Sequence, residues 1–529
     1  MKGYRIGIDV GGTNTDCVIV NADHEIVAKT KQPTTTDVSS GIANALSTIL
    51  KTSGIGPENI QHVMLGTSQC TNAVVERKQL SKVGIIRICK PASVCIPPLS
   101  DFPEDMAALL KDHVYMVSGG FEYDGRPIHP LDEEEVRKIL NEMKSKVDSV
   151  AISGIFSKIN PEQEQRVADL AKEVLGDEIF ISMSYQIGSL GLLERENATI
   201  LNAMLHKIAK KMTSSFRSAV KACGVNATLH IGQNDGTLMS LEKARQFPVL
   251  TIASGPTNSI RGAAALSGVK DGIVIDVGGT TSDAGVLVKQ FPRESSKEAN
   301  IGGIRTNFRM PDVVAVGLGG GTIIHGHENK LVIGPKSVGH RVTVEAYSFG
   351  GDTYTLSDYA ILNNKLEIPK RIAKEVIASK IENTFQLDPV KVQSKVKDEV
   401  LGKINQLVDK VKTDNKTVPL IAVGGGSSIL PDKIEGISEV IQPHHYEVAN
   451  AYGACIAQVS GESERVFNLN VITREEAIKE VRKKAVENAI ASGAKKETIE
   501  TLLISDTPLA YLPNALKVSV KVCGDLNSS

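Results

Sequence analysis

The chain has 529 residues, of which 41% are hydrophobic and 23% are charged, and its formal net charge is −1 at pH 7. This length exceeds one ordinary hydrophobic core, so two or more domains are expected. The balanced charge argues against nucleic-acid binding, which needs a clustered basic face, and no apolar run approaches the ~20 residues that span a bilayer.

The first strand pattern covers residues 5–10 and leaves no room for a signal peptide before it. The seven cysteines are scattered and include no CxxC pair, which is a poor basis for a disulfide framework or a zinc site. We therefore expect a cytoplasmic protein with reduced cysteines.

A motif near the N-terminus recurs in the middle of the chain. Residues 9–16 read Asp-Val-Gly-Gly-Thr-Asn-Thr-Asp, and residues 276–283 read Asp-Val-Gly-Gly-Thr-Thr-Ser-Asp, so six of eight positions match. Each copy separates two apolar strand patterns, which predicts a β-hairpin with a Gly-Gly turn. The offset of 276 − 9 = 267 residues is far longer than a solenoid repeat and indicates two related domains.

Between the hairpins, strand and helix patterns alternate, which predicts an α/β lobe. The strand patterns lie at 62–65, 83–89, 149–155 and 179–183, and the helical patterns at 39–52, 71–79, 132–146, 161–175 and 193–222. We expect an N-terminal lobe at 1–190, a second lobe at 191–460 and a C-terminal helix and strand at 461–529.

The C-terminal segment carries two local signals. Thr473 and Glu476 have the spacing of a capping box, which predicts a helix that runs to about residue 491. Apolar residues then alternate with polar ones over 516–523. This period predicts a strand at a sheet edge with one face in water.

The duplicated hairpins indicate a phosphate site, because glycine turns leave backbone N–H groups free to surround an anion. Two facing hairpins would hold a polyphosphate, and strand-end Asp9 and Asp276 next to a polyanion imply a bound Mg²⁺. We expect ATP and Mg²⁺ as cofactors, with Asp9 and Asp276 as catalytic residues and metal ligands. The residues expected to bind phosphate are Gly11, Gly12, Thr13 and Asn14 in the first copy and Gly278, Gly279, Thr280 and Thr281 in the second.

A third motif follows a buried strand pattern at 420–423. Its residues, Gly424, Gly425, Gly426 and Ser427, give bare backbone against which adenine or ribose can lie. A plain strand-to-helix turn is the alternative. The chain contains no Walker GxxxxGK[ST] and no GxGxxG motif.

The order of two phosphate hairpins and a glycine-rich adenosine motif resembles the actin/hexokinase/Hsp70 superfamily. This resemblance implies a two-lobed, ribonuclease H-like α/β ATPase fold. Within it, several stretches resemble the hydantoinase A/5-oxoprolinase family in the same order. They are residues 66–73 with 76–78, 160–166, 194–199 with 202–203, 254–256, 508–513 and 524–526.

The family resemblance implies an ATP-dependent hydrolase that opens a cyclic amide through a phosphorylated intermediate. It also implies a separate hydantoinase-B-like subunit and an oligomeric assembly. The family usually has Gly-Thr-Thr where this chain has residues 66–68, Gly-Thr-Ser, and Ser-Gly-Pro-Ala-Gly-Gly where it has residues 254–259, Ser-Gly-Pro-Thr-Asn-Ser. The chain is also shorter than the usual hydantoinase A subunit, from which we expect a further C-terminal domain to be absent.

Other residues are candidates for the chemistry. Asp235, in a segment that resembles the family's Asp-Gly-Gly, can orient or deprotonate water, or can form an ordinary Asx turn. Thr67, Thr71 and Asn72 begin a predicted helix and are candidates for binding substrate, with helix capping as the alternative.

Some alternatives stay open. Residues 325 and 327 and residues 444 and 445 are histidine pairs without a third ligand at metal-binding spacing, and Cys70 is more typical of a buried residue than of a nucleophile. An ATP-dependent carboxylase of a ketone-type substrate, a small-molecule kinase and an ATP-gated interaction protein remain as other functions.

Overall fold

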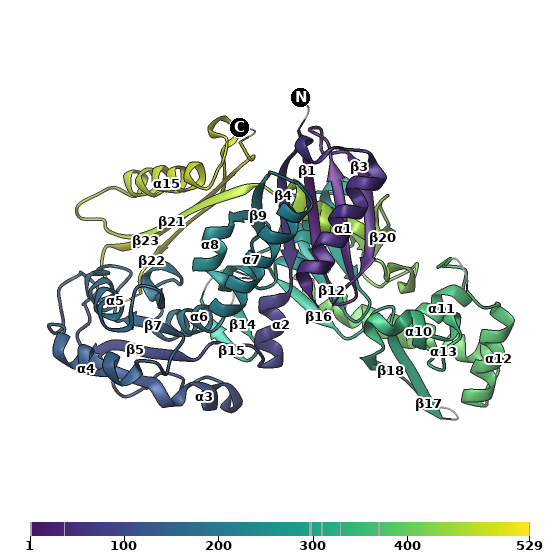
Figure 1. Cartoon of the computed structure of the whole chain (residues 1–529), viewed down its shortest axis with the longest axis horizontal. Helices are drawn as coiled ribbons and strands as arrows, with labels where there is room; N and C mark the ends of the chain where they lie inside the picture. The colour runs from purple at the N-terminus through teal and green to yellow at the C-terminus, as the bar shows by residue number, and fades with distance from the viewer. Residues whose placement is uncertain are drawn as a thin grey trace.

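The computed structural model describes residues 3–35, 37–295, 299–307, 310–327, 330–368, 371–510 and 512–527. It is elongated, with a four-stranded sheet at one end and helices α10 to α13 at the other (Figure 1). No helix in these ranges is long and apolar enough to cross a membrane.

A nine-stranded sheet forms the centre of the molecule. Its strands, in spatial order, are β22 (Glu500–Pro508), β23 (Ala515–Gly524), β21 (Val459–Asn468), β10 (Leu238–Ser240), β9 (Thr228–Gly232), β4 (Ile60–Thr67), β1 (Tyr4–Val10), β2 (Asn14–Val20) and β3 (Ile26–Pro33). Helices α1 (Val38–Ser53), α7 (His206–Ala222) and α8 (Leu241–Gln246) contribute to the core packed on β1, β4 and β9.

The second large sheet begins with the second hairpin. Its order is β13 (Phe291–Pro292), β12 (Ser282–Val288), β11 (Gly272–Val277), β19 (Val418–Val423) and β20 (Ile437–Ile441), and β16 (Val313–Val316) also pairs with β12. The small hairpin β17 (Thr322–His327) and β18 (Lys330–Ser337) extends from this lobe. It lies beside α10 (Val342–Glu345), α11 (Leu356–Leu362), α12 (Lys374–Phe385) and α13 (Pro389–Val411).

The two hairpins have the same register, which confirms the predicted duplication. Asp9 pairs with Asp16 across β1 and β2, and Asp276 pairs with Asp283 across β11 and β12. In each sheet the first strand of the hairpin also pairs in parallel with a later strand, β4 or β19. The predicted α/β fold with duplicated hairpins is therefore confirmed.

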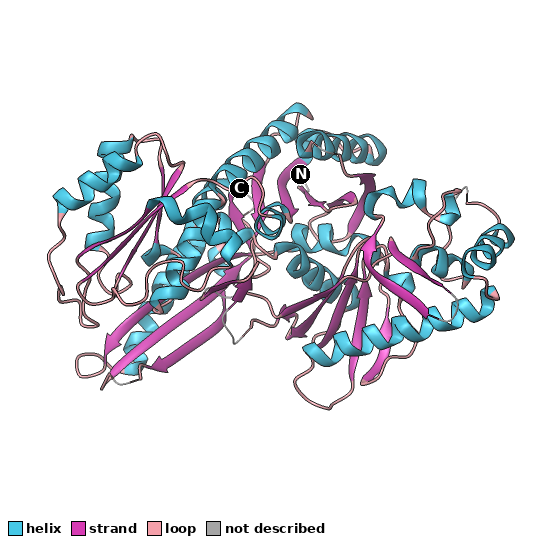
Figure 2. Ribbon diagram, turned by 90° about the horizontal axis from the view of Figure 1, so that it is seen from below, coloured by secondary structure: helices cyan, strands magenta, loops and turns pink. Residues whose placement is uncertain are grey.

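A separate four-stranded sheet consists of β6 (Val114–Ser118), β5 (Val83–Lys90), β7 (Ser149–Gly154) and β8 (Phe180–Met183). Helices α4 (Glu133–Met143) and α5 (Glu162–Leu175) pack on one face, and α6 (Leu192–Met204) packs on the other. Figure 2 shows helices on both faces of this sheet at the left of the molecule. Next to it lie α2 (Gln69–Glu76), α3 (Glu104–Leu110) and the hairpin of β14 (Ala299–Ile301) and β15 (Ile304–Thr306).

Helices α9 (Ser254–Ser267) and α14 (Ala449–Ile456) cross in direct contact beside both hairpin sheets. A Cβ on Gly262 would lie 1.9 Å from the carbonyl oxygen of Ala449, and one on Gly453 would lie 1.9 Å from that of Asn258. Gly7 in β1 gives α14 similar access, because a Cβ there would lie 2.0 Å from the carbonyl oxygen of Ala451. Glycines thus bring the two helices against each other and against the first hairpin.

The C-terminal strand differs from the prediction. β23 lies between β21 and β22, so it is an interior strand and not a sheet edge. Helix α15 (Arg474–Ala491), which starts at the predicted Thr473 capping box, covers one face. The polar residues Ser519 and Lys521 on the other face are 2% and 4% exposed. The ammonium of Lys521 is accommodated there because it forms ion pairs with Asp235 and Glu294. The prediction of a wet face is therefore wrong.

The nine-stranded sheet draws strands from residues 1–190, 191–460 and 461–529. The expected lobe limits at these positions therefore do not separate one sheet from another. The division into three segments stays a prediction.

Candidate active site

The turns of the two hairpins have equivalent backbone geometry. The N–H of Gly11 donates to the carbonyl of Asn14 at 3.0 Å, and the N–H of Gly278 donates to the carbonyl of Thr281 at 2.9 Å. Both tips reach solvent, since Gly12 and Thr280 are exposed. Each turn therefore leaves backbone donors without side-chain cover, as an anion site requires.

The two turns also face each other. A Cβ on Gly279 would lie 2.8 Å from Oγ1 of Thr13, so the second turn approaches the hydroxyl of the first. The carbonyl of Thr13 is held by the N–H of Thr34 at 3.0 Å. The structure thus brings together the two phosphate motifs that the sequence placed 267 residues apart.

A segment that the sequence did not assign to the site supports the second turn. Gly320 donates its N–H to Gly278 at 3.0 Å, and Gly321 donates to Gly279 at 2.7 Å. A Cβ on Gly319 would lie 2.6 Å from the backbone nitrogen of Thr280. The glycine run at 317–321 was visible in the sequence, but nothing in it indicated this contact.

The triple-glycine motif lies directly against the second hairpin. A Cβ on Gly424 would lie 2.2 Å from Oδ1 of Asp276, and Gly424 has a φ of 84°. Gly426 donates its N–H to the carbonyl of Val277 at 2.8 Å. By contrast, the nearest atom to a Cβ on Gly425 is Nζ of Lys31 at 4.0 Å, so this position is open.

Ser427, the last residue of that motif, is buried and accepts a hydrogen bond from Nε2 of Gln442 at 2.8 Å. Its hydroxyl oxygen is therefore used inside the protein. A role for Ser427 in nucleotide binding stays a prediction.

Four carboxyl groups converge near the two turns. Burial raises the pKa of Asp9 well above its ordinary value, and the charges of Asp16 and Asp276 raise it further. Burial also raises the pKa of Asp276, against a hydrogen bond from the Ser259 hydroxyl that lowers it. Burial, followed by the charge of Asp276, raises the pKa of Asp283 to about 7. The site thus concentrates carboxyl groups whose charged forms are poorly solvated.

Lys31, on β3, offsets part of this charge. Its Nζ lies 2.6 Å from a carboxylate oxygen of Asp16, and it lowers the pKa of Asp9, Asp16 and Asp276. Lys31 was missed in the sequence, because a lysine on an alternating strand carries no local signal. Only the pairing of β3 with β2 brings it to the site.

The carboxyl groups beside the two turns are of the kind that the predicted Mg²⁺ requires. In the described parts of the chain, no three His, Cys, Asp or Glu side chains are placed to hold a metal by themselves. Mg²⁺ is usually held by one or two carboxylates together with waters and substrate phosphates. Oxygen donors with raised pKa values beside an anion site match that mode, and Asp9 and Asp276 are the residues that would hold the ion.

Asp235 lies in a tight turn and is fully paired. Its Oδ1 accepts from the N–H of Thr237 at 2.9 Å, and its Oδ2 lies 3.0 Å from Nζ of Lys521. Burial alone would raise the pKa of Asp235, but Lys521 and Thr237 hold it below its ordinary value. This geometry matches the Asx turn, and a lowered pKa makes the carboxylate a poor proton acceptor. Its catalytic role stays a prediction.

The proposed substrate-binding residues lie at the start of helix α2, and Thr71 connects it to the residue before α9. Thr67 Oγ1 accepts from the N–H of Gln69 at 3.2 Å, and Thr71 Oγ1 accepts from the N–H of Ala253 at 3.2 Å. Asn72 donates to the Ser68 hydroxyl at 3.3 Å. The N-cap of α2 is Ser68, whose side chain makes no capping hydrogen bond. Substrate binding by the three residues stays a prediction.

Other residues of the family-like stretches form buried polar contacts. Glu196 in α6 forms an ion pair with Arg87 in β5, and the two side chains are 1% and 0% exposed. Glu164 in α5 accepts from the Ser157 hydroxyl at 2.5 Å, and Ser184 accepts from Nε of Arg195 at 3.0 Å. These contacts connect α5 and α6 to β5 and to the segments that follow β7 and β8. Tyr511, in the stretch at 508–513, lies outside the described residues.

The structure does not support the cysteine and histidine candidates for a nucleophile or a metal site. Cys70 is 1% exposed, and burial raises the pKa of its thiol to about 11, as a buried structural cysteine requires. Nδ1 of His445 lies 2.8 Å from Nζ of Lys29. A lysine ammonium at this distance would repel a metal ion bound to the same histidine. The side chain of His327 lies outside the described residues.

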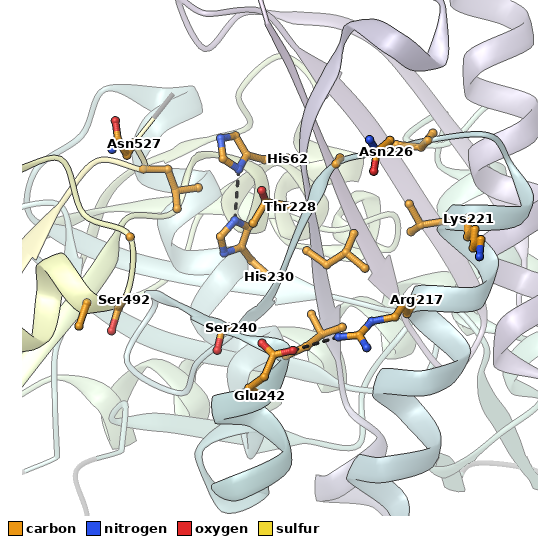
Figure 3. A pocket seen from close by; sticks show the side chains of 18 of the residues that line it. His62, Arg217, Lys221, Asn226, Thr228, His230, Ser240, Glu242, Ser492 and Asn527 are labelled. Atoms are coloured by element: carbon orange, nitrogen blue, oxygen red, sulfur yellow. Dashed lines mark hydrogen bonds and ion pairs between the residues drawn. The ribbon is translucent and has the colours of Figure 1, made fainter. Parts of the chain in front are cut away.

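A pocket of about 870 Å³ lies away from the four aspartates, toward the other end of β4 and β9. His62 and His230 project into it, with His62 Nδ1 3.2 Å from His230 Nε2 (Figure 3). Burial lowers the pKa of both imidazoles to about 4, so both are neutral at pH 7. No pattern in the sequence indicated this pocket.

Comparison with known proteins identifies the relatives of this arrangement. The model of the hydantoinase/oxoprolinase N-terminal region matches residues 5–175, and the hydantoinase/oxoprolinase model matches residues 195–463. The caprolactamase alpha subunit of Pseudomonas jessenii is 27% identical over 412 residues, which are 72% of this chain and 58% of that subunit. The chain therefore spans little more than half the length of this curated relative.

Two solved structures share the fold over 99% of this chain. The ATP-dependent caprolactamase of Pseudomonas jessenii has a TM-score of 0.79 at 20% identity, with 88% of that chain covered. A nucleotide-free acetone carboxylase has a TM-score of 0.74 at 18% identity, with 88% of that chain covered. At these identities the likeness shows the fold alone.

Proposed function

Because the chain belongs to the hydantoinase/oxoprolinase family, we propose that it is an ATP-dependent hydrolase that opens a cyclic amide such as a hydantoin, 5-oxoproline or a related lactam. The observation that carries this proposal is the pair of facing glycine turns, with Thr13 beside Gly279 and four carboxyls at their base. ATP bridges the two turns through its phosphates.

The adenosine lies against the triple-glycine motif. Gly425 is the member with open space in front of it, whereas Gly424 and Gly426 are packed on the second hairpin. Asp9 and Asp276 would hold Mg²⁺, which would neutralise charge on the transferring phosphate. Lys31, 2.6 Å from Asp16, acts against the raised pKa of Asp16 and so favours its ionised form.

In the proposed reaction, phosphorylation by ATP activates the carbonyl carbon of the cyclic amide, which is otherwise a poor electrophile. The ring carbonyl oxygen attacks the γ-phosphorus, and the bond to the ADP oxygen breaks. Water then adds to the activated carbon, and the C–N bond breaks with a proton passing to nitrogen, which leaves an acyl phosphate. A second water hydrolyses this acyl phosphate to the ring-opened acid and inorganic phosphate. The chain's contribution is to position the reactants and to exclude bulk water.

The proposal is tested by phosphate release from ATP and Mg²⁺ with a panel of hydantoins, lactams and ketones. We expect release to rise at least tenfold with one class of cyclic amide and a ring-opened acid to form in equal amount. The measurement is repeated with a hydantoinase-B-like subunit, because the caprolactamase relative is one subunit of its enzyme. Phosphate release that no cyclic amide stimulates, with or without that subunit, contradicts the proposal.

A second candidate function follows from the acetone carboxylase structure, which has the same fold over 99% of this chain. A carboxylase would use the same nucleotide site to activate a ketone-type substrate or bicarbonate. In the same panel it would show ketone-dependent incorporation of labelled bicarbonate and no ring opening.

A further inference from the structure

One buried side chain beside the aspartates has no partner. Asn258, in the second turn of α9, is 0% exposed, and neither its Nδ2 nor its Oδ1 makes a hydrogen bond to any described residue. Nearly all buried side-chain amides in proteins are hydrogen-bonded, because an unpaired one loses its water contacts without replacement. An amide with both ends unpaired is therefore a candidate for binding a ligand.

Asn258 lies where the strands of the first sheet end. A Cβ on Gly66 would lie 2.9 Å from its Nδ2, and a Cβ on Gly232 would lie 3.0 Å from the same atom. Gly66 pairs with Asp9 across β4 and β1. Since neither glycine has a side chain, only backbone separates the carboxamide from the ends of β4 and β9.

Two more polar groups converge on the same point. The Cβ position of Gly66 lies 3.2 Å from Oδ1 of Asp9 and 3.4 Å from Oδ1 of Asn450, which is also buried without a partner. The neighbour of Asn258 in α9, Ser259, donates its hydroxyl to Asp276. The start of α9 thus connects the unpaired carboxamide to the catalytic aspartates of both hairpins.

We propose that Asn258 recognises the amide edge of the substrate, an inference that rests on the proposed cyclic-amide hydrolase. A small ring holds its amide in the cis form, so N–H and C=O lie on the same edge. That edge complements a carboxamide, because the ring N–H donates to Oδ1 while Nδ2 donates to the ring C=O. A ketone or a lactone satisfies only Nδ2 and leaves Oδ1 unpaired, so Asn258 selects amides over both.

The carboxamide of Asn258 is closed off from solvent, because Asn258 is 0% exposed. The entering substrate must therefore open the contact between α9 and the ends of β4 and β9. The Asn258 carboxamide narrows the range of substrates that such an opening accepts.

The test compares a lactam with the lactone of the same ring size, which differs only in having oxygen in place of N–H. The readout is the ratio of the two kcat/KM values, lactam over lactone, from ATP-dependent phosphate release, to which spontaneous lactone hydrolysis contributes nothing. The intrinsic reactivities of the two rings are the same for every variant and cancel between proteins. We expect Asn258→Ala to lower this ratio about tenfold or more, the effect of losing one buried hydrogen bond.

Two controls separate recognition from folding. Asn202 is a buried asparagine with both ends paired, since Nδ2 donates to Gln246 at 2.9 Å and Oδ1 accepts from Val249 at 3.3 Å. Asn202→Ala is expected to lower the melting temperature and leave the ratio unchanged. Asn258→Gly serves if Asn258→Ala does not fold. In both Asn258 variants the melting shift caused by an ATP analogue with Mg²⁺ is expected to persist.

The outcomes are distinct. A ratio that falls in the Asn258 variants and not in Asn202→Ala supports the assignment. A ratio unchanged in an active Asn258 variant, or a wild-type protein that does not prefer the lactam, overturns it and leaves the hydrolase proposal standing. A wild-type protein that no cyclic amide stimulates overturns both.

Discussion

Replacement of Asp283 by asparagine tests whether the carboxyl cluster is electrostatically strained before nucleotide binds. Asp283 pairs directly with Asp276 across the second hairpin, and burial and that neighbour raise its pKa from 3.8 to about 7. A folded-state pKa above the unfolded one means that the folded protein holds this proton more tightly. The contribution of Asp283 to wild-type stability is therefore lost as pH rises from about 4 to about 7, and Asp283→Asn removes this part of the pH dependence.

The size of the effect follows from the shift. About three pKa units at 1.36 kcal/mol each set a ceiling of about 4 kcal/mol. The side chain of Asp283 is only partly buried, and solvent screening reduces the expected gain to about 1–3 kcal/mol. An unfolding entropy of about 2.1 cal/mol/K per residue over 529 residues converts this gain to about 1–3 °C. Asp283→Asn should therefore melt about 1–3 °C above wild type at pH 8 and at the same temperature near pH 4.

The assay is thermal unfolding of both proteins from pH 4 to pH 8 without nucleotide, with Asp352→Asn as the control. The carboxylate of Asp352 is 99% exposed, so its replacement should give no pH-dependent difference. Adding Mg²⁺ with a non-hydrolysable ATP analogue should narrow the gap at pH 8, since a nearby cation favours the charged carboxylate. A gap that is flat across pH, or a less stable Asp283→Asn at pH 8, refutes the reasoning.

The remaining predictions concern the nucleotide site and the C-terminal strand. Asp9→Ala and Asp276→Ala should each lower ATP turnover at least 100-fold in a folded protein, because one or both hold the metal and phosphates; near-normal turnover in either variant counts against the paired-hairpin site. Gly425→Val should weaken the melting shift caused by nucleotide, and a full shift would show that adenosine lies elsewhere. Lys521→Met should lower the free energy of unfolding, measured in urea, by about 3–5 kcal/mol, because it leaves Asp235 buried without its ion pair. Adding Asp235→Asn should restore more than half of this loss, and no recovery would mean that the ion pair is not its cause.

Local patterns in the sequence determined the elements of the site. Each hairpin is specified by two apolar strands and a glycine turn, so both were predictable from residues adjacent in the chain. The capping box at Thr473 is equally local, because its partners are three residues apart. The predicted nucleotide motifs needed no long-range information to be recognised, although their facing arrangement did.

Contacts between distant segments decided the rest. Lys31 reaches Asp16 only because β3 pairs with β2. The alternating pattern of β23 predicted an exposed Lys521, and only the packing of the chain places Lys521 beside buried Asp235. Asn258 lies next to Gly66 at the end of β4, although the two residues are 192 positions apart in the chain (258 − 66). This contact between distant segments is what makes Asn258 a candidate for substrate recognition. Hydrophobic period and turn chemistry act over a few residues, whereas the partner of a buried charge or amide is chosen by how sheets and helices pack.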